Sequence, residues 1–162
     1  MMQLTGYYWP MLGNSYEGQV CSAARSLEVV GERWSLLIIR DALFGGVTRF
    51  SDFLRRLGLA RNILAARLDG FIEAGIMERF SSEGSAYQEY RLTEKGRDLA
   101  TVIIALTDWG DRWAAPNGRP IIYRHAECGG EVEQQLVCRE CGSVIEQDQV
   151  GIEIGPGMTG AA

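Results

Sequence analysis

Four residues in the C-terminal third of the chain have the types and spacing of a metal site. His125 and Cys128 form an H-x2-C pair, and after nine intervening residues Cys138 and Cys141 form a C-x2-C pair. One imidazole and three thiolates can hold zinc tetrahedrally, and glycines directly after Cys128 and Cys141 suit tight turns whose amides approach sulfur. The pattern predicts a zinc ion in a small β-rich lobe. A metal-free hairpin with buried thiols and a redox-active Cys138–Cys141 pair are alternatives that the spacing leaves open.

The second group of chemistry-bearing residues is a basic segment in the middle of the chain. Residues 49–67 contain five arginines and one aspartate. Arginine can bind guanine, and asparagine can bind adenine, through two hydrogen bonds each, so Arg61 and Asn62 ahead of the apolar Leu64 suit the reading of bases. The net charge of −5 does not oppose this, because the acidic excess lies in the C-terminal tail and a local basic patch still attracts phosphates.

The elements that would position these residues follow from hydrophobic periodicity and glycine breaks. Helices are predicted over residues 20–30, from Trp34 to the Gly45-Gly46 pair, over residues 52–57 with Ser51 as N-cap, and through residues 64–72 up to Gly75. The last two of these helices are joined by only a few residues. They therefore form a helix-turn-helix candidate.

A predicted hairpin and a predicted last helix complete this unit. Residues 76–80 and 87–92 are strand-like runs on either side of a Ser/Gly-rich link, which indicates a β-hairpin. Thr93 is the predicted N-cap of a long helix. In that helix an apolar seam recurs at alternating three- and four-residue steps: Leu99, Val102, Leu106, Trp109 and Trp113. The seam predicts a homodimer contact, with packing on the chain's own core as the alternative.

The order of the elements is that of a winged helix-turn-helix, and five runs then resemble the HxlR-type bacterial transcriptional regulators, relatives of the MarR group. The runs are CSAARSL (21–27), GERWSLLIIR (31–40), RFSDF (49–53), EAGI (73–76) and YRLTEKG (90–96), within a match that spans about residues 21–113. The resemblance implies an α+β, mainly helical fold with a winged helix-turn-helix and a long C-terminal dimerisation helix, to which the β-rich Cys/His lobe is added. It also implies a sequence-specific DNA-binding transcriptional regulator.

The resemblance bears on single residues as well. Cys21 matches a cysteine that serves some members of the family as a thiol sensor, while the residue type alone favours a small buried side chain over a sensor. The family pattern more often has Ser or Thr at the position of Ala60 and Pro at that of Arg61, so the chain departs from it at the start of the recognition helix. Tails with Cys-Gly and Cys-x-x-Cys-Gly occur in some of these regulators.

The expected DNA contacts follow from the way in which a helix-turn-helix docks. The second helix enters the major groove with its N-terminal residues nearest the bases. The predicted base-reading residues are Ala60, Arg61, Asn62, Ile63 and Ala65. The predicted backbone contacts are Arg49, Ser51 and Arg55 from the preceding helix, Arg67, and Ser82 and Ser85 from the wing. For Arg67 an ion pair with an internal carboxylate is the alternative.

Length and composition set the domain organisation and the compartment. A chain of 162 residues with 46% hydrophobic and 23% charged residues fits one globular domain plus a small appendage. The predicted divisions are an N-terminal arm (1–19), the winged-helix domain (20–115), a zinc-ribbon-like lobe (116–150) and a flexible tail (151–162). No apolar run approaches the roughly 20 residues of a membrane-spanning helix, and no basic and apolar leader is present, so we expect a cytoplasmic protein.

Together these patterns predict a homodimer that binds a pseudo-palindromic operator in double-stranded DNA. An effector would act by small-molecule binding between the core and the last helix, or by cysteine or metal chemistry. A protein-interaction module on the same scaffold is the alternative. Catalysis is not expected, because the single histidine belongs to the Cys/His cluster, no phosphate-binding glycine loop precedes a helix, and zinc with four protein ligands has no open position.

Overall fold

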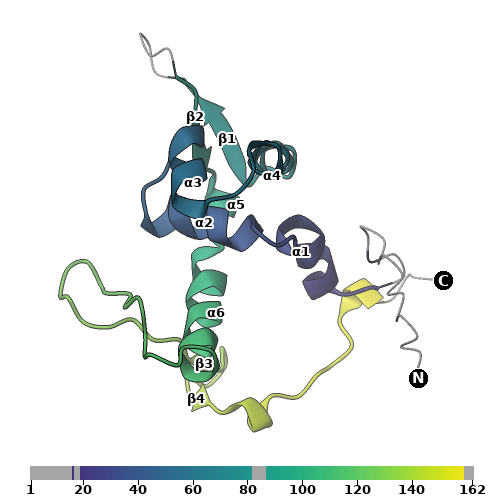
Figure 1. The fold of residues 1–162 in the computed structure, drawn as a ribbon. Helices are drawn as coiled ribbons and strands as arrows, with labels where there is room; N and C mark the ends of the chain where they lie inside the picture. The colour runs from purple at the N-terminus through teal and green to yellow at the C-terminus, as the bar shows by residue number, and fades with distance from the viewer. Residues whose placement is uncertain (1–15, 17–18, 82–86, 159–162) are drawn as a thin grey trace, which may run out of the picture.

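The computed structural model describes residue 16 and residues 19–81 and 87–158 (Figure 1). Most of the predicted N-terminal arm, the tip of the predicted wing with Ser82 and Ser85, and the last four residues lie outside the described residues. Helices predominate, and the described strands form two small antiparallel sheets. The expected α+β, mainly helical class is therefore confirmed.

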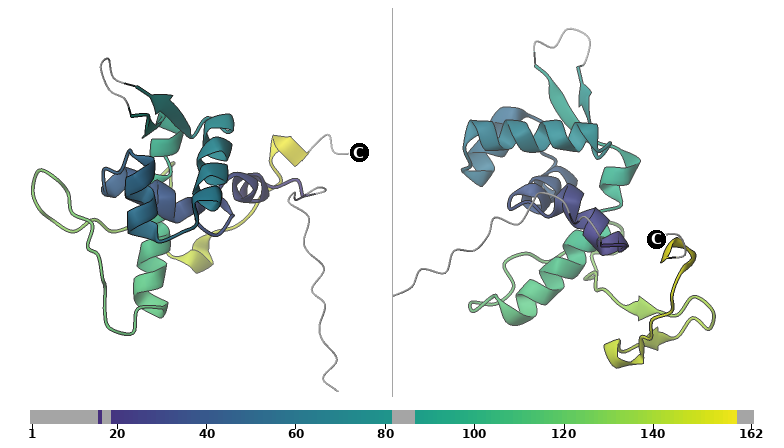
Figure 2. Two further views of the ribbon diagram at one scale, coloured as in Figure 1. Left: turned by 45° about the horizontal axis from the view of Figure 1, so that its top comes forward. Right: turned by 90° about the vertical axis from the view of Figure 1, so that its right-hand side faces the viewer.

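The elements follow one another in the predicted order. They are α1 (Ser22–Val30), α2 (Ser35–Phe44), α3 (Phe50–Leu57), α4 (Arg61–Glu73), β1 (Met77–Phe80), β2 (Glu89–Leu92), α5 (Glu94–Arg97), α6 (Ala100–Trp113), β3 (Leu136–Val137) and β4 (Val144–Ile145), with short 3-10 turns at Gln147–Gln149 and Pro156–Met158. The β1–β2 wing and α6 project from opposite sides of the helical core (Figures 1 and 2). No described helix has both the length and the apolar character that crossing a bilayer requires.

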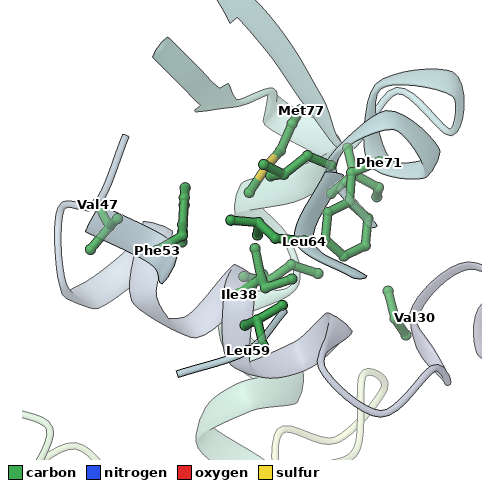
Figure 3. Close-up of a cluster of buried hydrophobic side chains, with 11 residues drawn as sticks. Val30, Ile38, Val47, Phe53, Leu59, Leu64, Phe71 and Met77 are labelled. Atoms are coloured by element: carbon green, nitrogen blue, oxygen red, sulfur yellow. The ribbon is translucent and has the colours of Figure 1, made fainter. Parts of the chain in front are cut away.

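One apolar core holds α2, α3 and α4 together (Figure 3). Ile38 of α2, Phe53 of α3 and Leu64 of α4 are completely buried, and Phe71 and Met77 close the cluster toward β1. Burial of each such side chain stabilises the fold by about 1.5–3 kcal/mol relative to exposure. The helical spacing of the apolar residues in α4 therefore leaves the opposite side of its first turn free to face outward.

The start of α3 differs from the prediction that Ser51 is its N-cap. The helix begins at Phe50, and the N-cap is Arg49, whose side chain makes no capping hydrogen bond. The cause is pairing with the wing, because the Tyr90 amide donates to the Thr48 carbonyl at 2.8 Å and Arg49 forms a bridge with Glu89. The extended backbone thus ends at Arg49, and the helix starts directly after it.

The wing strands are confirmed as an antiparallel pair. Met77 lies opposite Leu92 and Phe80 opposite Glu89. The hydrogen bond from the Tyr90 amide to the Thr48 carbonyl also pairs β2 of the wing with the short extended segment ahead of α3. The hairpin is therefore tied directly to the helix-turn-helix.

The single long helix predicted after Thr93 is two helices. Thr93 caps α5 as predicted, since its Oγ1 accepts from the Gly96 amide at 3.2 Å. Residues 98 and 99, between α5 and α6, keep right-handed helical dihedral angles. Gly96 of α5 packs directly on the carbonyl of Ile76, where a Cβ atom would lie only 2.2 Å from the oxygen. Thr93 Oγ1 also donates to the Gly75 carbonyl at 2.7 Å, so α5 is fixed against the end of α4. The helix that starts again at Ala100 has 14 residues.

The tail after α6 is built differently from the core. None of the described residues 114–158 is buried. Tyr123 attaches the tail to the core, with its ring 4.6 Å from that of Phe44 and its hydroxyl 3.4 Å from Thr107 Oγ1. The strands β3 and β4 flank the Cys138–Cys141 turn and form a short hairpin around it. The end of the tail lies beside the start of α1, where Gly155 and Met158 border the same depression as Cys21.

Candidate nucleic-acid interface

The helix-turn-helix presents the predicted base-reading residues on one exposed surface. Gly58, at φ +63°, ends α3, and Ala60 is extended before α4 begins at Arg61. Arg61, Asn62 and Ile63 are exposed in the first turn, whereas Leu64 is fully buried. The first turn of α4 therefore offers a guanidinium and an amide to solvent beside the small side chain of Ala60.

A residue that sequence reasoning did not identify supports Arg61. The guanidinium lies 5.4 Å from the ring centre of Phe50, in the range of a cation–π contact. Phe50 is the first residue of α3, so this contact links the start of the recognition helix to the helix that precedes it. The aromatic residue between Arg49 and Ser51 was the available signal in the sequence.

The predicted phosphate-binding residues around α3 are exposed and weakly paired. Arg55 donates to Asp52 at 2.8 Å, and Arg49 lies 3.9 Å from Glu89, while Ser51 is exposed between them. Exposed ion pairs contribute only about 0–1 kcal/mol each, so a phosphate can replace such a partner at little cost. The side chains of Arg49 and Arg55 are thus available to an anionic backbone.

Arg67 and Ala65 lie further along α4. Arg67 donates to Glu32 at 2.9 Å, which is the internal ion pair that the sequence left open as the alternative to a phosphate contact. Ala65 is half-buried, and Ala66 is exposed. The side of α4 that carries Arg67 therefore faces the turn between α1 and α2.

Two carboxylates that the sequence analysis did not single out form three further ion pairs, which hold the parts of the interface together. The buried carboxylate of Asp41 in α2 accepts from Arg40 at 2.7 Å and from Arg56 of α3 at 3.3 Å. Arg79 of β1 pairs with Asp69 of α4 and so connects the wing to the recognition helix. An aspartate inside the apolar run of α2 was the only sequence signal for the first of these contacts.

The predicted metal ligands come together as two pairs. His125 Nδ1 lies 3.2 Å from Cys128 Sγ, and Cys138 forms a side-chain hydrogen bond with Cys141. Hydrogen bonds from the Ser143 side chain and amide, and from Cys138, lower the pKa of Cys141 to about 7. Among the described residues no three His, Cys, Asp or Glu side chains are grouped for one ion. Cys128 and Cys141 are exposed and Cys138 is half-buried, so the alternative of buried thiols is wrong.

Cys21 is exposed, so a role as a small buried side chain is also wrong. It is the N-cap of α1, and the nearby amides of Ala24 and Ala23 lower the pKa of its thiol. A thiol at a helix N-terminus is stabilised as the thiolate, the reactive form.

The predicted dimer seam is divided between the core and solvent. Leu99 packs on the apolar core. Val102, Leu106, Trp109 and Trp113 are exposed, the last two by 61% and 65%. Next to the tryptophans is a groove of about 820 Å³, bordered on its other side by Leu136 and Ile145 of the β3–β4 hairpin.

This fold and this exposed surface define a winged helix-turn-helix protein. The chain belongs to the HxlR-like helix-turn-helix family, which it matches over residues 29–118. It is 45% identical to the HTH-type transcriptional regulator Rv3095 of Mycobacterium tuberculosis, over 91% of this chain and 92% of that one. The prediction of a DNA-binding transcriptional regulator is thereby confirmed and is favoured over an interaction module.

Solved structures separate the family core from the tail. In sequence, this chain is 40% identical to PA1607, a protein of known crystal structure. The two structures match with a TM-score of 0.75 over 82% of this chain and 94% of that one. The redox regulator HypR in its reduced form is 26% identical, with a TM-score of 0.52 over 57% of this chain and 92% of that one. The longer matches to Rv3095 and PA1607 extend into the tail, whereas the match to HypR has the extent of the winged-helix unit alone.

Proposed function

We propose that this regulator binds a pseudo-palindromic operator as a homodimer, with the first turn of α4 in the major groove. The observation that carries the proposal is the joint exposure of Arg61 and Asn62 above the buried Leu64. Arginine reads guanine and asparagine reads adenine in that groove. Arg49, Ser51 and Arg55 would contact the flanking phosphates, because they are exposed beside α4 and their ion pairs are weak.

The homodimer is formed through the exposed apolar face of α6. Along α6 lies a row of large exposed apolar side chains: Val102, Leu106, Trp109 and Trp113. Such a contiguous exposed patch is characteristic of an interaction surface. A second α6 packed along it would bury these side chains and place the two recognition helices about one helical turn of DNA apart.

Two features support regulation by an effector. The exposed Cys21 thiol at the start of α1 fits a thiol sensor, and the structural relative HypR is described as a redox regulator in both reduced and oxidised forms. A mostly apolar cavity of about 330 Å³ lies between α1 and the start of α6, bordered by Val30, Lys95 and Leu99. This volume is at the lower end of the roughly 300–1,000 Å³ range of small-molecule sites.

The operator can be found by selection. The purified protein is incubated at about 150 mM salt with random duplexes, and the bound fragments are sequenced, since specific binding normally exceeds non-specific binding by roughly 10³-fold or more. We expect an enriched inverted repeat that Arg61→Ala no longer enriches. Arg139→Ala, an exposed arginine of the tail, is the matched control and should enrich the same repeat. A folded wild-type protein that enriches no sequence would contradict the proposal.

A further inference from the structure

The two turns that carry the His/Cys pairs have the same backbone geometry. The amide of Gly129 donates to the carbonyl of His125 at 2.9 Å, and the amide of Gly142 donates to the carbonyl of Cys138 at 2.9 Å. Both glycines have φ of +71°, in the left-handed region that residues with a side chain rarely adopt. The chain therefore builds one turn twice, each time around two ligand-type side chains.

The equivalence continues on either side of each turn. The amide of His125 donates to the carbonyl of Gly130 at 2.8 Å, and that of Cys138 donates to the carbonyl of Ser143 at 2.9 Å. In the first turn the Gly130 amide also points at Cys128 Sγ, at 3.4 Å, and in the second turn the Ser143 amide donates to Cys141. Amide hydrogen bonds to sulfur favour the thiolate, which is the form that binds metal.

Each turn holds its two donor atoms at a separation suited to one ion. His125 Nδ1 and Cys128 Sγ are 3.2 Å apart. In a tetrahedral zinc site with Zn–N near 2.0 Å and Zn–S near 2.3 Å, neighbouring nitrogen and sulfur ligands are about 3.5 Å apart. Cys138 and Cys141 are likewise within hydrogen-bond reach of each other. One turn supplies half of the four ligands that a structural zinc site requires.

We propose that the two turns close on a single zinc ion in each chain, held by the imidazole of His125 and the thiolates of Cys128, Cys138 and Cys141. The described residues do not group three of these side chains, so closure brings one turn toward the other. The link allows this movement, because three exposed residues outside any strand, 133–135, join the last pairing of the first turn to β3. Three extended residues span up to about 10 Å.

The described part of the tail has no apolar core of its own. None of its described residues is buried, and Val137 and Val144, which pair across the hairpin, are more than half exposed. Lobes below about 40 residues usually need a disulfide, a metal ion or a partner to be stable. A disulfide between Cys138 and Cys141 would leave the matching turn at His125 without a purpose, whereas one zinc ion uses both turns.

The first test is metal content and ligand type. We expect about one zinc per chain by elemental analysis of the purified protein, and tetrahedral thiolate spectra after replacement with Co²⁺. Cys128→Ser and Cys138→Ser, one in each turn, should each lower zinc affinity by more than the roughly 10–100-fold that loss of an outer hydrogen bond costs. Cys21→Ser is the matched control and should keep the metal.

Three results would overturn the site: protein without zinc that gives no Co²⁺ spectrum, a Cys138–Cys141 disulfide in the isolated protein, or full zinc content in either turn variant. These outcomes are independent of DNA binding, because the four ligands lie outside α3 and α4.

A mixing experiment tests whether all four ligands come from one chain. One variant carries His125→Ala and Cys128→Ser, and the other carries Cys138→Ser and Cys141→Ser. We expect neither variant to bind zinc, alone or after the two are unfolded and refolded together. Recovery of zinc in the mixture would show that two chains share the ion and would overturn closure within one chain.

Discussion

The winged-helix core and the tail contrast in what holds them together. In the core, Ile38, Phe53 and Leu64 are completely buried, and α2, α3 and α4 share one apolar cluster. In the tail, residues 114–158, no side chain is buried, and structure comes from turns, a two-residue strand pair and surface ion pairs. Apolar burial therefore holds the core together, whereas the described tail has no apolar core of its own.

Truncation of a core side chain should give the largest difference between the two regions. Phe53→Ala removes a completely buried ring and should lower the free energy of unfolding by about 3–5 kcal/mol. Leu136→Ala in β3, where the side chain is 43% exposed, should change it by less than about 0.5 kcal/mol. Urea unfolding followed by circular dichroism measures both free energies. Equal losses in the two variants would contradict the claim that apolar burial stabilises the core but not the tail.

A methyl group at Gly96 should have the next largest effect. Gly96→Ala places a Cβ atom 2.2 Å from the Ile76 carbonyl oxygen, so the junction of α5 with the wing must move, at a cost of about 3 kcal/mol. Gly70→Ala, where a Cβ atom meets nothing within 4 Å in a helix, should instead stabilise the protein by about 0.5–1 kcal/mol. A thermal unfolding shift of the same sign for both variants would contradict the close packing of Gly96.

Ion pairs sharpen the comparison at a smaller scale. Asp41→Asn weakens charged hydrogen bonds of a buried carboxylate to Arg40 and Arg56 and should cost about 1.5–3 kcal/mol. Arg119→Ala breaks two exposed ion pairs, one with Asp111 of α6 and one with Glu131 of the tail. It should lower the free energy of unfolding by at most about 1 kcal/mol. Chemical denaturation of the two variants under identical conditions measures both losses. A loss in Arg119→Ala as large as that in Asp41→Asn would contradict the claim that burial makes the Asp41 pairs stronger.

The smallest expected effect is a gain. Ala60 has the extended conformation of an N-cap but no side chain to accept a hydrogen bond from the first turn of α4. Ala60→Ser should therefore raise the free energy of unfolding by about 0.5–1 kcal/mol. Ser51→Ala, in the first turn of α3 but not at its cap, is the control and should change stability little. A loss of stability in Ala60→Ser would mean that α4 begins elsewhere.

The part of the fold that apolar periodicity governs was predictable from the sequence. Leu64, Leu68 and Phe71 recur at helical spacing and are buried, and the strands 76–80 and 87–92 pair as the Ser/Gly-rich link indicated. The exposure of Arg61 and Asn62 followed from the same helical pattern.

Features that depend on contacts between distant residues were not predictable. The start of α3 is set by pairing of Thr48 with Tyr90, and Gly96 of α5 packs on the carbonyl of the distant Ile76. The partner of Arg67 lies in the turn between α1 and α2, far away in the chain. The spacing of the His/Cys pairs predicted two tight turns but did not determine where the second hairpin lies.

The most direct test of the central claim is the ratio of two dissociation constants, for the selected operator and for a scrambled duplex of the same length, measured by fluorescence anisotropy. We expect the wild-type protein to prefer the operator by roughly 10³-fold or more, and Arg61→Ala to lose about 1–3 kcal/mol of that discrimination. Arg139→Ala should keep the wild-type ratio. An unchanged ratio in a folded Arg61→Ala protein would contradict the claim that the first turn of α4 reads DNA sequence.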